Sequence, residues 1–151
     1  MTGEPREGDA SPMRPRLANA VDHDWIAEVY RTIRFVPSPP DAVHVVAEED
    51  GQRVGLGRLT NAGPGAVELG GMYVAESHRG RGLARTIVMR LLEEAGERRV
   101  YCVPFVHLVD FYRSCGLADP PEGLVVPAEV EAKMRACDGA FDEGVTLLVR
   151  L

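Results

Sequence analysis

The residues best suited to chemistry lie in one stretch, Glu68 to Ala84, which reads ELGGMYVAESHRGRGLA. It begins as an apolar, β-prone run and ends in a glycine-rich turn, Arg79 to Ala84. The turn opens into the periodic apolar segment Leu83 to Arg98, which predicts a helix. A strand, a glycine turn and a helix in this order present free backbone N–H groups to a phosphate.

Two common phosphate motifs do not fit the turn. A P-loop needs Lys-Ser or Lys-Thr after its glycines, and neither pair follows Gly82. A dinucleotide fingerprint needs a βαβ unit and an acidic residue about 20 residues further on, whereas hairpin strands are predicted before this turn. In the alternative without a ligand, the glycines only allow a tight corner between strand and helix. The residues alone leave both interpretations open.

Composition limits the class of protein. The 151 residues suffice for one ordinary domain, and the net charge of −6 disfavours nucleic-acid binding. No apolar run of about 18 residues predicts a membrane span, and residues 1–13 lack the apolar region of a secretory signal. Three scattered cysteines, Cys102, Cys115 and Cys137, indicate reduced thiols, the first two packed in the core. We therefore expect a cytoplasmic protein without a metal, a disordered tail at 1–13 and a single domain at 14–151.

The hydrophobic periodicity predicts a mixed α/β sheet, with Asp22 capping the first helix. Three strands in an antiparallel meander precede the glycine turn. The meander is followed by elements in the order β-α-β-α-β. The predicted strands are residues 16–20, 42–49, 53–60, 66–74, 99–103 and 145–151, and the predicted helices are residues 23–34, 83–98, 106–115 and 127–136.

With this order of elements, the sequence resembles the GNAT superfamily of acyl-CoA N-acyltransferases. The family's phosphate signature is Arg or Gln, two residues, Gly, one residue, then Gly or Ala, and Arg79, Gly82 and Ala84 satisfy it. Residues 72–74 look like the family's fourth strand, and residues 111–117 resemble its F-Y-x-x-x-G-F helix end. The resemblance covers about residues 16–117 and implies the GNAT-like α/β fold.

The resemblance implies acetyl-CoA as cosubstrate. Met72, Tyr73 and Val74 would orient the thioester by pairing with the pantetheine arm. Gly70-Gly71 would permit a bulge there, or else simply kink the strand. The arginines of the turn and Arg85 would add charge near the phosphates, or else be solvated. Backbone amides would hold the pyrophosphate at Arg79, Gly80, Arg81, Gly82, Leu83 and Ala84.

The resemblance also implies direct acyl transfer to an amine. Tyr112 matches the family's general acid, which protonates the leaving thiolate; the alternative is an aromatic that only packs. Glu68 is the candidate base, or else a residue of a solvated face. For His107 we weigh a part in proton transfer against a surface or capping role. Phe105 departs from the family, because many relatives have an Asn there that contacts the pantetheine.

The sequence thus predicts an N-acetyltransferase that acts on a small, unidentified amine, without nucleic-acid or membrane partners; a homodimer is left open. The resemblance implies an acceptor site built from Arg31, Arg34, Phe35, the loop 36–40 and Arg58. Arg31 or Arg34 would receive a substrate carboxylate, or else be exposed charges at the end of a helix. One alternative is a non-catalytic acyl-CoA-binding regulatory module of the same fold. Another is an interaction domain whose glycines are structural.

Overall fold

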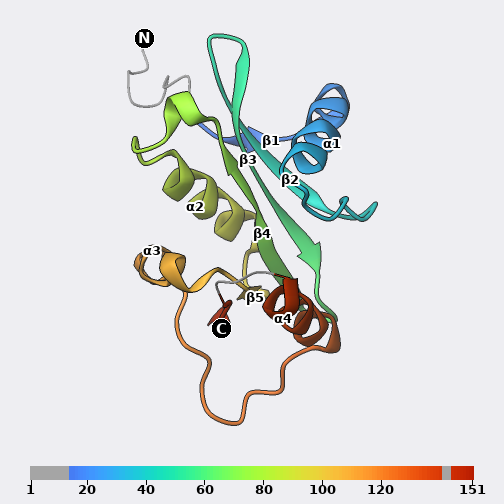
Figure 1. The fold of residues 1–151 in the computed structure, drawn as a ribbon, viewed down its shortest axis with the longest axis vertical. Helices are drawn as coiled ribbons and strands as arrows, with labels where there is room; N and C mark the ends of the chain where they lie inside the picture. The colour runs from blue at the N-terminus through green and yellow to red at the C-terminus, as the bar shows by residue number, and fades with distance from the viewer. Residues whose placement is uncertain (1–13, 141–143) are drawn as a thin grey trace. The chain divides into compact units, whose positions relative to one another are not determined.

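The computed structural model describes residues 14–140 and 144–151, so the tail predicted at residues 1–13 lies outside the described part (Figure 1). The strands form one mixed sheet in chain order, β1 to β6, with β4 and β5 parallel and β5 and β6 antiparallel. The predicted mixed α/β fold is confirmed. The elements are β1 Arg16–Leu17, η1 Ala20–Asp22, α1 His23–Thr32, β2 Val43–Glu49, β3 Gln52–Asn61, β4 Ala66–Val74, η2 Glu76–His78, α2 Leu83–Ala95, β5 Arg99–Cys102, η3 Val106–Leu108, α3 Val109–Ser114, α4 Ala128–Ala140 and β6 Leu148–Arg150.

The chain divides into two compact units. The first contains residues 1–58 and 71–91, and the second contains residues 59–70 and 92–151. Strands β3 and β4 and helix α2 each run from one unit into the other. The single domain expected at residues 14–151 stays a prediction.

In the first unit, α1 and α2 lie on opposite sides of β2 and β3 (Figure 1). Leu56 of β3 packs in a buried cluster with residues of α1 and β2. Its neighbours Gly55 and Gly57 point to the other face, because successive strand residues alternate. A Cβ atom would lie 2.7 Å from Ile87 at Gly55 and 2.8 Å from Leu91 at Gly57. The two glycines therefore let α2 approach the sheet closely.

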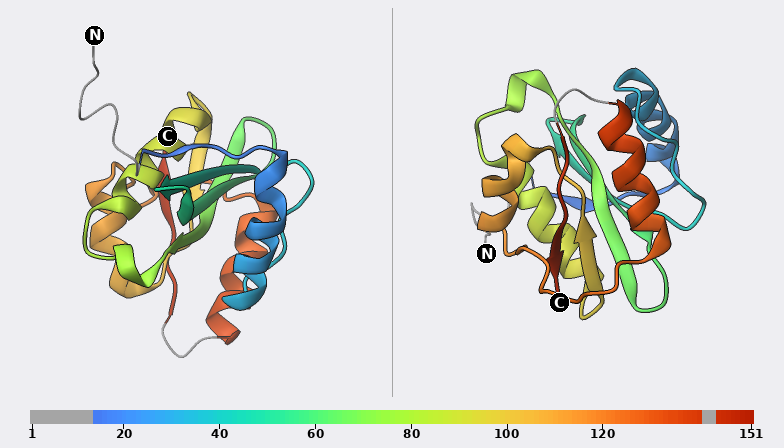
Figure 2. Two further views of the ribbon diagram at one scale, coloured as in Figure 1. Left: turned by 90° about the horizontal axis from the view of Figure 1, so that it is seen from above. Right: turned by 60° about the horizontal axis from the view of Figure 1, so that its bottom comes forward.

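In the second unit, α3 and α4 lie on opposite sides of β5 and β6 in both views of Figure 2. Tyr101 of β5 packs in a buried cluster with Val130 of α4 and Val149 of β6. The next residue, Cys102, points to the opposite face, and both Cys102 and Cys115 are buried as predicted. The second unit therefore has a separate packed layer on each face of its strands.

Several predicted boundaries were wrong. Strand β1 ends at Leu17 and not at residue 20, and α2 ends at Ala95 and not at residue 98. The last strand is only Leu148–Arg150, and Val145 makes an isolated bridge with Phe105 instead of extending it. The last helix continues to Ala140, beyond the predicted end at Ala136. The segment 136–140 contains no proline, so backbone sterics does not end the helix earlier, although Gly139 has a low helix propensity.

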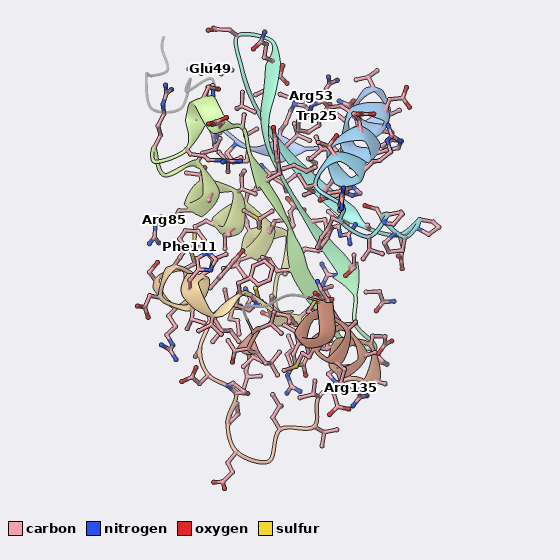
Figure 3. All side chains as sticks on the ribbon, in the orientation of Figure 1. Trp25, Glu49, Arg53, Arg85, Phe111 and Arg135 are labelled. Carbon is pink, nitrogen blue, oxygen red and sulfur yellow. The ribbon has the colours of Figure 1, made fainter. Side chains whose placement is uncertain are left out.

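A buried carboxylate organises the start of the first unit. Asp22 is 0% exposed and accepts hydrogen bonds from Arg16 at 2.8 and 3.0 Å, from Arg53 at 2.7 Å and from the Asn19 backbone N–H at 2.8 Å. These bonds, those from Arg16 first, hold the pKa of Asp22 well below its usual range. Figure 3 shows Arg53 beside Trp25, over whose ring its guanidinium carbon lies 5.9 Å from the centroid.

The predicted capping role of Asp22 was therefore wrong. Asp22 occupies the N-cap position of α1 but makes no capping bond to that helix. The side chain of Asn19 caps η1 instead, and Asp22 completes that capping box. The position of Asp22 just before the helix suggests a cap, but its carboxylate instead pairs with Arg16 of β1 and Arg53 of β3.

We expect Asp22→Asn to lower the free energy of unfolding by about 2–4 kcal/mol, because two arginines lose their partner and both are partly exposed. A folded pKa below the usual value means that this stability is present above about pH 4 and is lost as the pH falls further. Urea unfolding at pH 7 and pH 3 measures both effects. Glu48→Gln is the control, since Glu48 pairs with the same Arg16 at a 37% exposed site and should cost under about 1 kcal/mol.

Candidate active site

The glycine turn before α2 is open on its outer side. Gly80 and Gly82 have φ angles of +80° and +81°, and no atom lies within 4 Å of a Cβ placed at either residue. The glycines are therefore required by backbone conformation and not by packing. The N–H groups in the first turn of α2 have no intrahelical acceptor. Such a turn can accept an anion against its backbone.

Hydrogen bonds tie this turn to the rest of the first unit. The Arg79 guanidinium donates to the Val74 carbonyl oxygen at 3.0 Å, which closes the loop between β4 and the turn. His78 bonds the Glu49 carboxylate through Nε2, and its Nδ1 lies 2.7 Å from the Ser77 hydroxyl (Figure 3 labels Glu49). Since a carboxylate only accepts, Nε2 donates, and in the neutral ring Nδ1 accepts from Ser77. Sequence reasoning missed this anchor because Glu49 lies 29 residues before His78.

Strand β4 is kinked where the sequence predicted a bulge. Gly71 has a φ angle of +60° in mid-strand, a conformation that favours glycine. The Tyr30 hydroxyl donates to the Gly71 carbonyl oxygen at 2.9 Å, and a Cβ at Gly71 would lie 2.5 Å from that hydroxyl. Both backbone conformation and packing therefore require glycine at this position.

The kink lies just beyond the last pairing of β4 with β5. The register runs from Ala66–Arg99 to Leu69–Cys102, where β5 ends. Strand β4 continues to Val74, so its last five residues extend past the final β5 pair in the part of the chain that the structure describes. Backbone groups on that side of β4 can therefore bind an extended ligand such as a pantetheine arm.

Tyr112, the predicted acid, is 6% exposed on α3. Burial raises the pKa of its phenol, and the nearby Cys102 and Cys115 thiols add to the shift. Its hydroxyl makes no hydrogen bond to any residue among 14–140 and 144–151. Buried tyrosine hydroxyls usually have a partner, as that of Tyr30 does. The unpaired hydroxyl of Tyr112 is thus a proton donor without an acceptor in the described protein.

Glu68, the predicted base, is paired with a residue that sequence reasoning missed. Its carboxylate bonds the ammonium of Lys133 on α4, and the side chains are 12% and 24% exposed. Glu68 pairs in register with Tyr101, which faces α4, whereas Cys102 and Tyr112 influence each other on the α3 side. The two predicted catalytic residues therefore lie on different faces of β4 and β5.

The predicted acceptor residues of the first unit surround a cavity of about 600 Å³. Arg31, Arg34, Phe35 and the proline loop line it, together with Tyr30 and His44. Arg58 is 6% exposed, and its guanidinium carbon lies 4.9 Å from the Tyr30 ring centroid and 4.6 Å from that of Phe35. The structure thus brings most of the predicted acceptor residues together around one cavity. Arg58 is buried against the rings of Tyr30 and Phe35.

The polar part of this cavity is fixed by Ser38. Its hydroxyl oxygen accepts from Arg58 at 2.9 Å and lies 2.7 Å from His44 Nε2. A hydroxyl both donates and accepts, so Ser38 either gives its proton to Nε2 or accepts one from it, according to the tautomer of the neutral ring. Burial first, then the charges of Arg58 and His23, lowers the pKa of His44 to about 4.

This pKa predicts that stability falls in mild acid. Between about pH 6.5 and 4 the unfolded chain protonates His44 and the folded protein does not, so the free energy of unfolding decreases as the pH falls through that range. Because His44 is partly exposed, we expect a loss of about 1 kcal/mol. Urea unfolding of the wild type and His44→Gln at pH 7.5 and 4.5 measures it. The variant should lose less over this range, and His107→Gln, an exposed histidine that is not among the causes of this shift, is the control.

His107 and Phe105 lie against each other. The His107 ring stacks on Phe105 with centroids 6.2 Å apart, and its part in proton transfer stays a prediction. Across residues 14–140 and 144–151, no group of three His, Cys, Asp or Glu side chains is arranged to hold a metal ion. No helix in the described ranges is long and apolar enough to cross a membrane.

Several solved structures share the fold of this chain. An acyl-CoA N-acyltransferase from Pseudomonas aeruginosa is 20% identical, with a TM-score of 0.66 over 92% of this chain and 99% of that chain. A variant of the spermidine N-acetyltransferase SpeG from Vibrio cholerae is 17% identical, with a TM-score of 0.67 over 91% and 94% of the two chains. N-acetylglutamate synthase from Neisseria gonorrhoeae, complexed with coenzyme A and L-arginine, is 18% identical, with a TM-score of 0.66 over 90% of this chain and 32% of that chain.

At these identities the solved structures establish the fold alone. A search of curated proteins finds no significant match. The model of the acetyltransferase (GNAT) family, however, matches residues 11–117, which is more than half of the chain. The chain therefore belongs to the acetyltransferase (GNAT) family and is an N-acetyltransferase.

Proposed function

We propose that the protein transfers the acetyl group of acetyl-CoA directly to a primary amine. The observation that carries this proposal is the buried Tyr112 hydroxyl, which lacks a hydrogen-bond partner in the described protein. A leaving thiolate needs such a proton. The family match supports an acyl-CoA cosubstrate.

The first unit would hold the cosubstrate. The open side of the turn at Gly80 and Gly82 suits a pyrophosphate, and the backbone of residues 79–84 would bind it. Met72, Tyr73 and Val74 would orient the pantetheine along the stretch of β4 beyond its last β5 pair. Bound there, acetyl-CoA supplies the activated acyl group.

The raised pKa of Tyr112 supports its role as the acid. Burial keeps its phenol protonated at neutral pH, and an acid with a raised pKa gives up its proton only to a strong base. Burial makes a thiolate a stronger base. It raises the pKa of the Cys102 thiol, which lies near Tyr112, to about 12. The leaving sulfur would be desolvated in the same way, which makes it a stronger base and favours transfer of the Tyr112 proton to it.

Glu68 would take the proton of the incoming amine. It lies on the opposite face of β4 and β5 from Tyr112. In the structure its carboxylate is engaged by Lys133, so the amine would have to compete with that lysine. The three free cysteines support a reducing compartment, and we place the enzyme in the cytoplasm.

A thiol-release assay with acetyl-CoA tests the proposal across amino acids, polyamines, aminoglycosides and N-terminal peptides. The expected result is thiol release with at least one amine class, together with the acetylated product. A regulatory module would bind coenzyme A without release from any amine. A fold with purely structural glycines would show no thermal stabilisation, whereas acetyl-CoA at 100 times its Kd should contribute about 2.7 kcal/mol.

A further inference from the structure

An arginine occupies the position at the end of α1 where glycine is usually found. The Arg34 N–H donates to the Arg31 carbonyl oxygen at 3.2 Å, and the Phe35 N–H donates to the Tyr30 carbonyl oxygen at 2.8 Å. These two bonds form a Schellman motif, in which the residue with left-handed backbone is usually glycine. Here that residue is Arg34, with a φ angle of +60°. The end of the helix alone therefore does not account for an arginine at this position.

The charge of Arg34 is not used within the described protein. Its guanidinium forms no hydrogen bond or ion pair with residues 14–140 and 144–151. Arg31, in contrast, pairs with Glu28 and already places a positive charge in the last turn of α1, where the helix dipole favours one. Arg34 thus combines an unfavourable backbone conformation with a charge that has no described partner, which indicates a ligand.

Arg34 lines the cavity of about 600 Å³, and the charges of this cavity are positive. Arg31 and Arg34 belong to its lining, and no aspartate or glutamate is among the described residues that line it. Burial first, and then the charges of Arg58 and His23, lower the pKa of His44, which also lines the cavity. The cavity therefore disfavours a further positive charge and suits an anionic group.

The remainder of the lining is largely apolar. It includes Ile26, Tyr30, Phe35 and the prolines of the loop 37–40. An apolar group of a ligand gains free energy when it leaves water for such a surface. A carboxylate is bound best by a guanidinium, which can donate two N–H groups to it. The lining thus fits a ligand that has an apolar body and one carboxylate.

Tyr30 connects this cavity with the proposed cosubstrate site. It lines the cavity, and its hydroxyl donates to the Gly71 carbonyl oxygen at 2.9 Å. Gly71 directly precedes residues 72–74, which we expect to orient the pantetheine, and Tyr73 packs against the buried cluster that contains Tyr30. All these residues belong to the first unit. The cavity and this stretch of β4 are therefore in contact within one compact unit.

We propose that the cavity binds the acceptor and that the acceptor is an amine with a carboxylate and an apolar body, such as an α-amino acid with a large apolar side chain. Arg34 would bind the carboxylate, and the side chain would lie against Tyr30 and Phe35. The inference rests on the proposed function for the reaction, whereas binding of the carboxylate does not depend on turnover. Polyamines and aminoglycosides carry several positive charges and no carboxylate, so we expect them to be poor acceptors.

Titration calorimetry with N-acetylphenylalanine and N-acetylphenylalaninamide tests the recognition without turnover. The two probes differ only in a carboxylate against a carboxamide, and we expect the wild type to bind the acid at least about 10-fold more tightly. Arg34→Gly should abolish this preference, because it removes the guanidinium. Its Tm should stay constant or rise by up to about 3 °C, because glycine adopts a φ angle of +60° without strain.

Asp50→Gly is the matched control. Asp50 has a φ angle of +52° in the hairpin between β2 and β3 and does not line the cavity. The substitution gives the same backbone freedom to a site without ligand, so the preference for the acid should stay within about twofold of the wild type. An equal loss of preference in both variants would overturn the role of Arg34.

Thiol release with phenylalanine, phenylalaninamide and spermidine adds the reaction itself. We expect the highest kcat/KM with phenylalanine, and Arg34→Gly should lower that value by about 10- to 100-fold. Turnover of spermidine by a protein that neither binds nor acetylates the carboxylates would overturn the inference and leave the proposed function intact. Binding of the acid through Arg34 without turnover of any amine would contradict the proposed function and support the ligand class. Equal affinity of the wild type for acid and amide would overturn the inference in either case.

Discussion

Replacing Tyr112 with phenylalanine is expected to lower kcat by about 100- to 10,000-fold and to change the Kd of acetyl-CoA by less than about twofold. The hydroxyl is the only group removed, and in the described protein it bonds to nothing. Its loss therefore leaves no donor or acceptor of the protein unsatisfied. We expect the free energy of unfolding to stay constant or to rise by up to about 1 kcal/mol, since a buried unpaired polar group is removed.

This combination separates an acid from a packing residue. An aromatic that only packs would tolerate phenylalanine without loss of turnover. Steady-state kinetics, calorimetry with acetyl-CoA and urea unfolding supply the three measurements. Tyr101→Phe is the matched control, because Tyr101 is 1% exposed on the neighbouring β5 strand and faces the α4 cluster. Its kcat should stay within about twofold, and an unchanged kcat in Tyr112→Phe would rule out the acid role.

The parts of the site that depend on backbone conformation could be predicted from sequence. Glycine is the favoured residue at the φ angles near +80° in the turn and +60° in β4. Glycines at positions 71, 80 and 82 therefore indicate these backbone conformations in the sequence itself. The hairpin at Asp50-Gly51 is a similar case, with φ angles of +52° and +80°. These features are local in sequence, and short-range reasoning suffices for them.

The parts that depend on long-range side-chain contacts could not be predicted. Glu68 and Lys133 are 65 residues apart, and nothing in either neighbourhood marks the pair. Asp22 has the spacing of a helix cap, yet Arg53, 31 residues away, decides its role. Burial and the charge of Arg58, which lies outside the strand of His44, lower the pKa of that histidine. The composition did contain one clue, the single lysine of the chain, which draws attention to Lys133 before any contact is known.

Replacing Gly82 with valine is expected to weaken acetyl-CoA binding by at least about 100-fold while the protein stays folded. A β-branched residue at a φ angle of +81° is strained by about 1–3 kcal/mol, and its side chain would fill the open side of the turn where we propose the pyrophosphate. Titration calorimetry measures the affinity, and thermal unfolding with acetyl-CoA should lose its ligand-induced shift.

The control must carry the same strain at a site without ligand, and Gly123 provides it. Its φ angle is +85°, no atom lies within 4 Å of a Cβ placed there, and it belongs to the loop before α4. Gly123→Val should lose similar stability and keep the wild-type Kd within about twofold. If both variants lost affinity equally, backbone strain would explain the loss. If Gly82→Val kept its affinity, the turn would be a structural corner, and the phosphate site would have to be sought elsewhere.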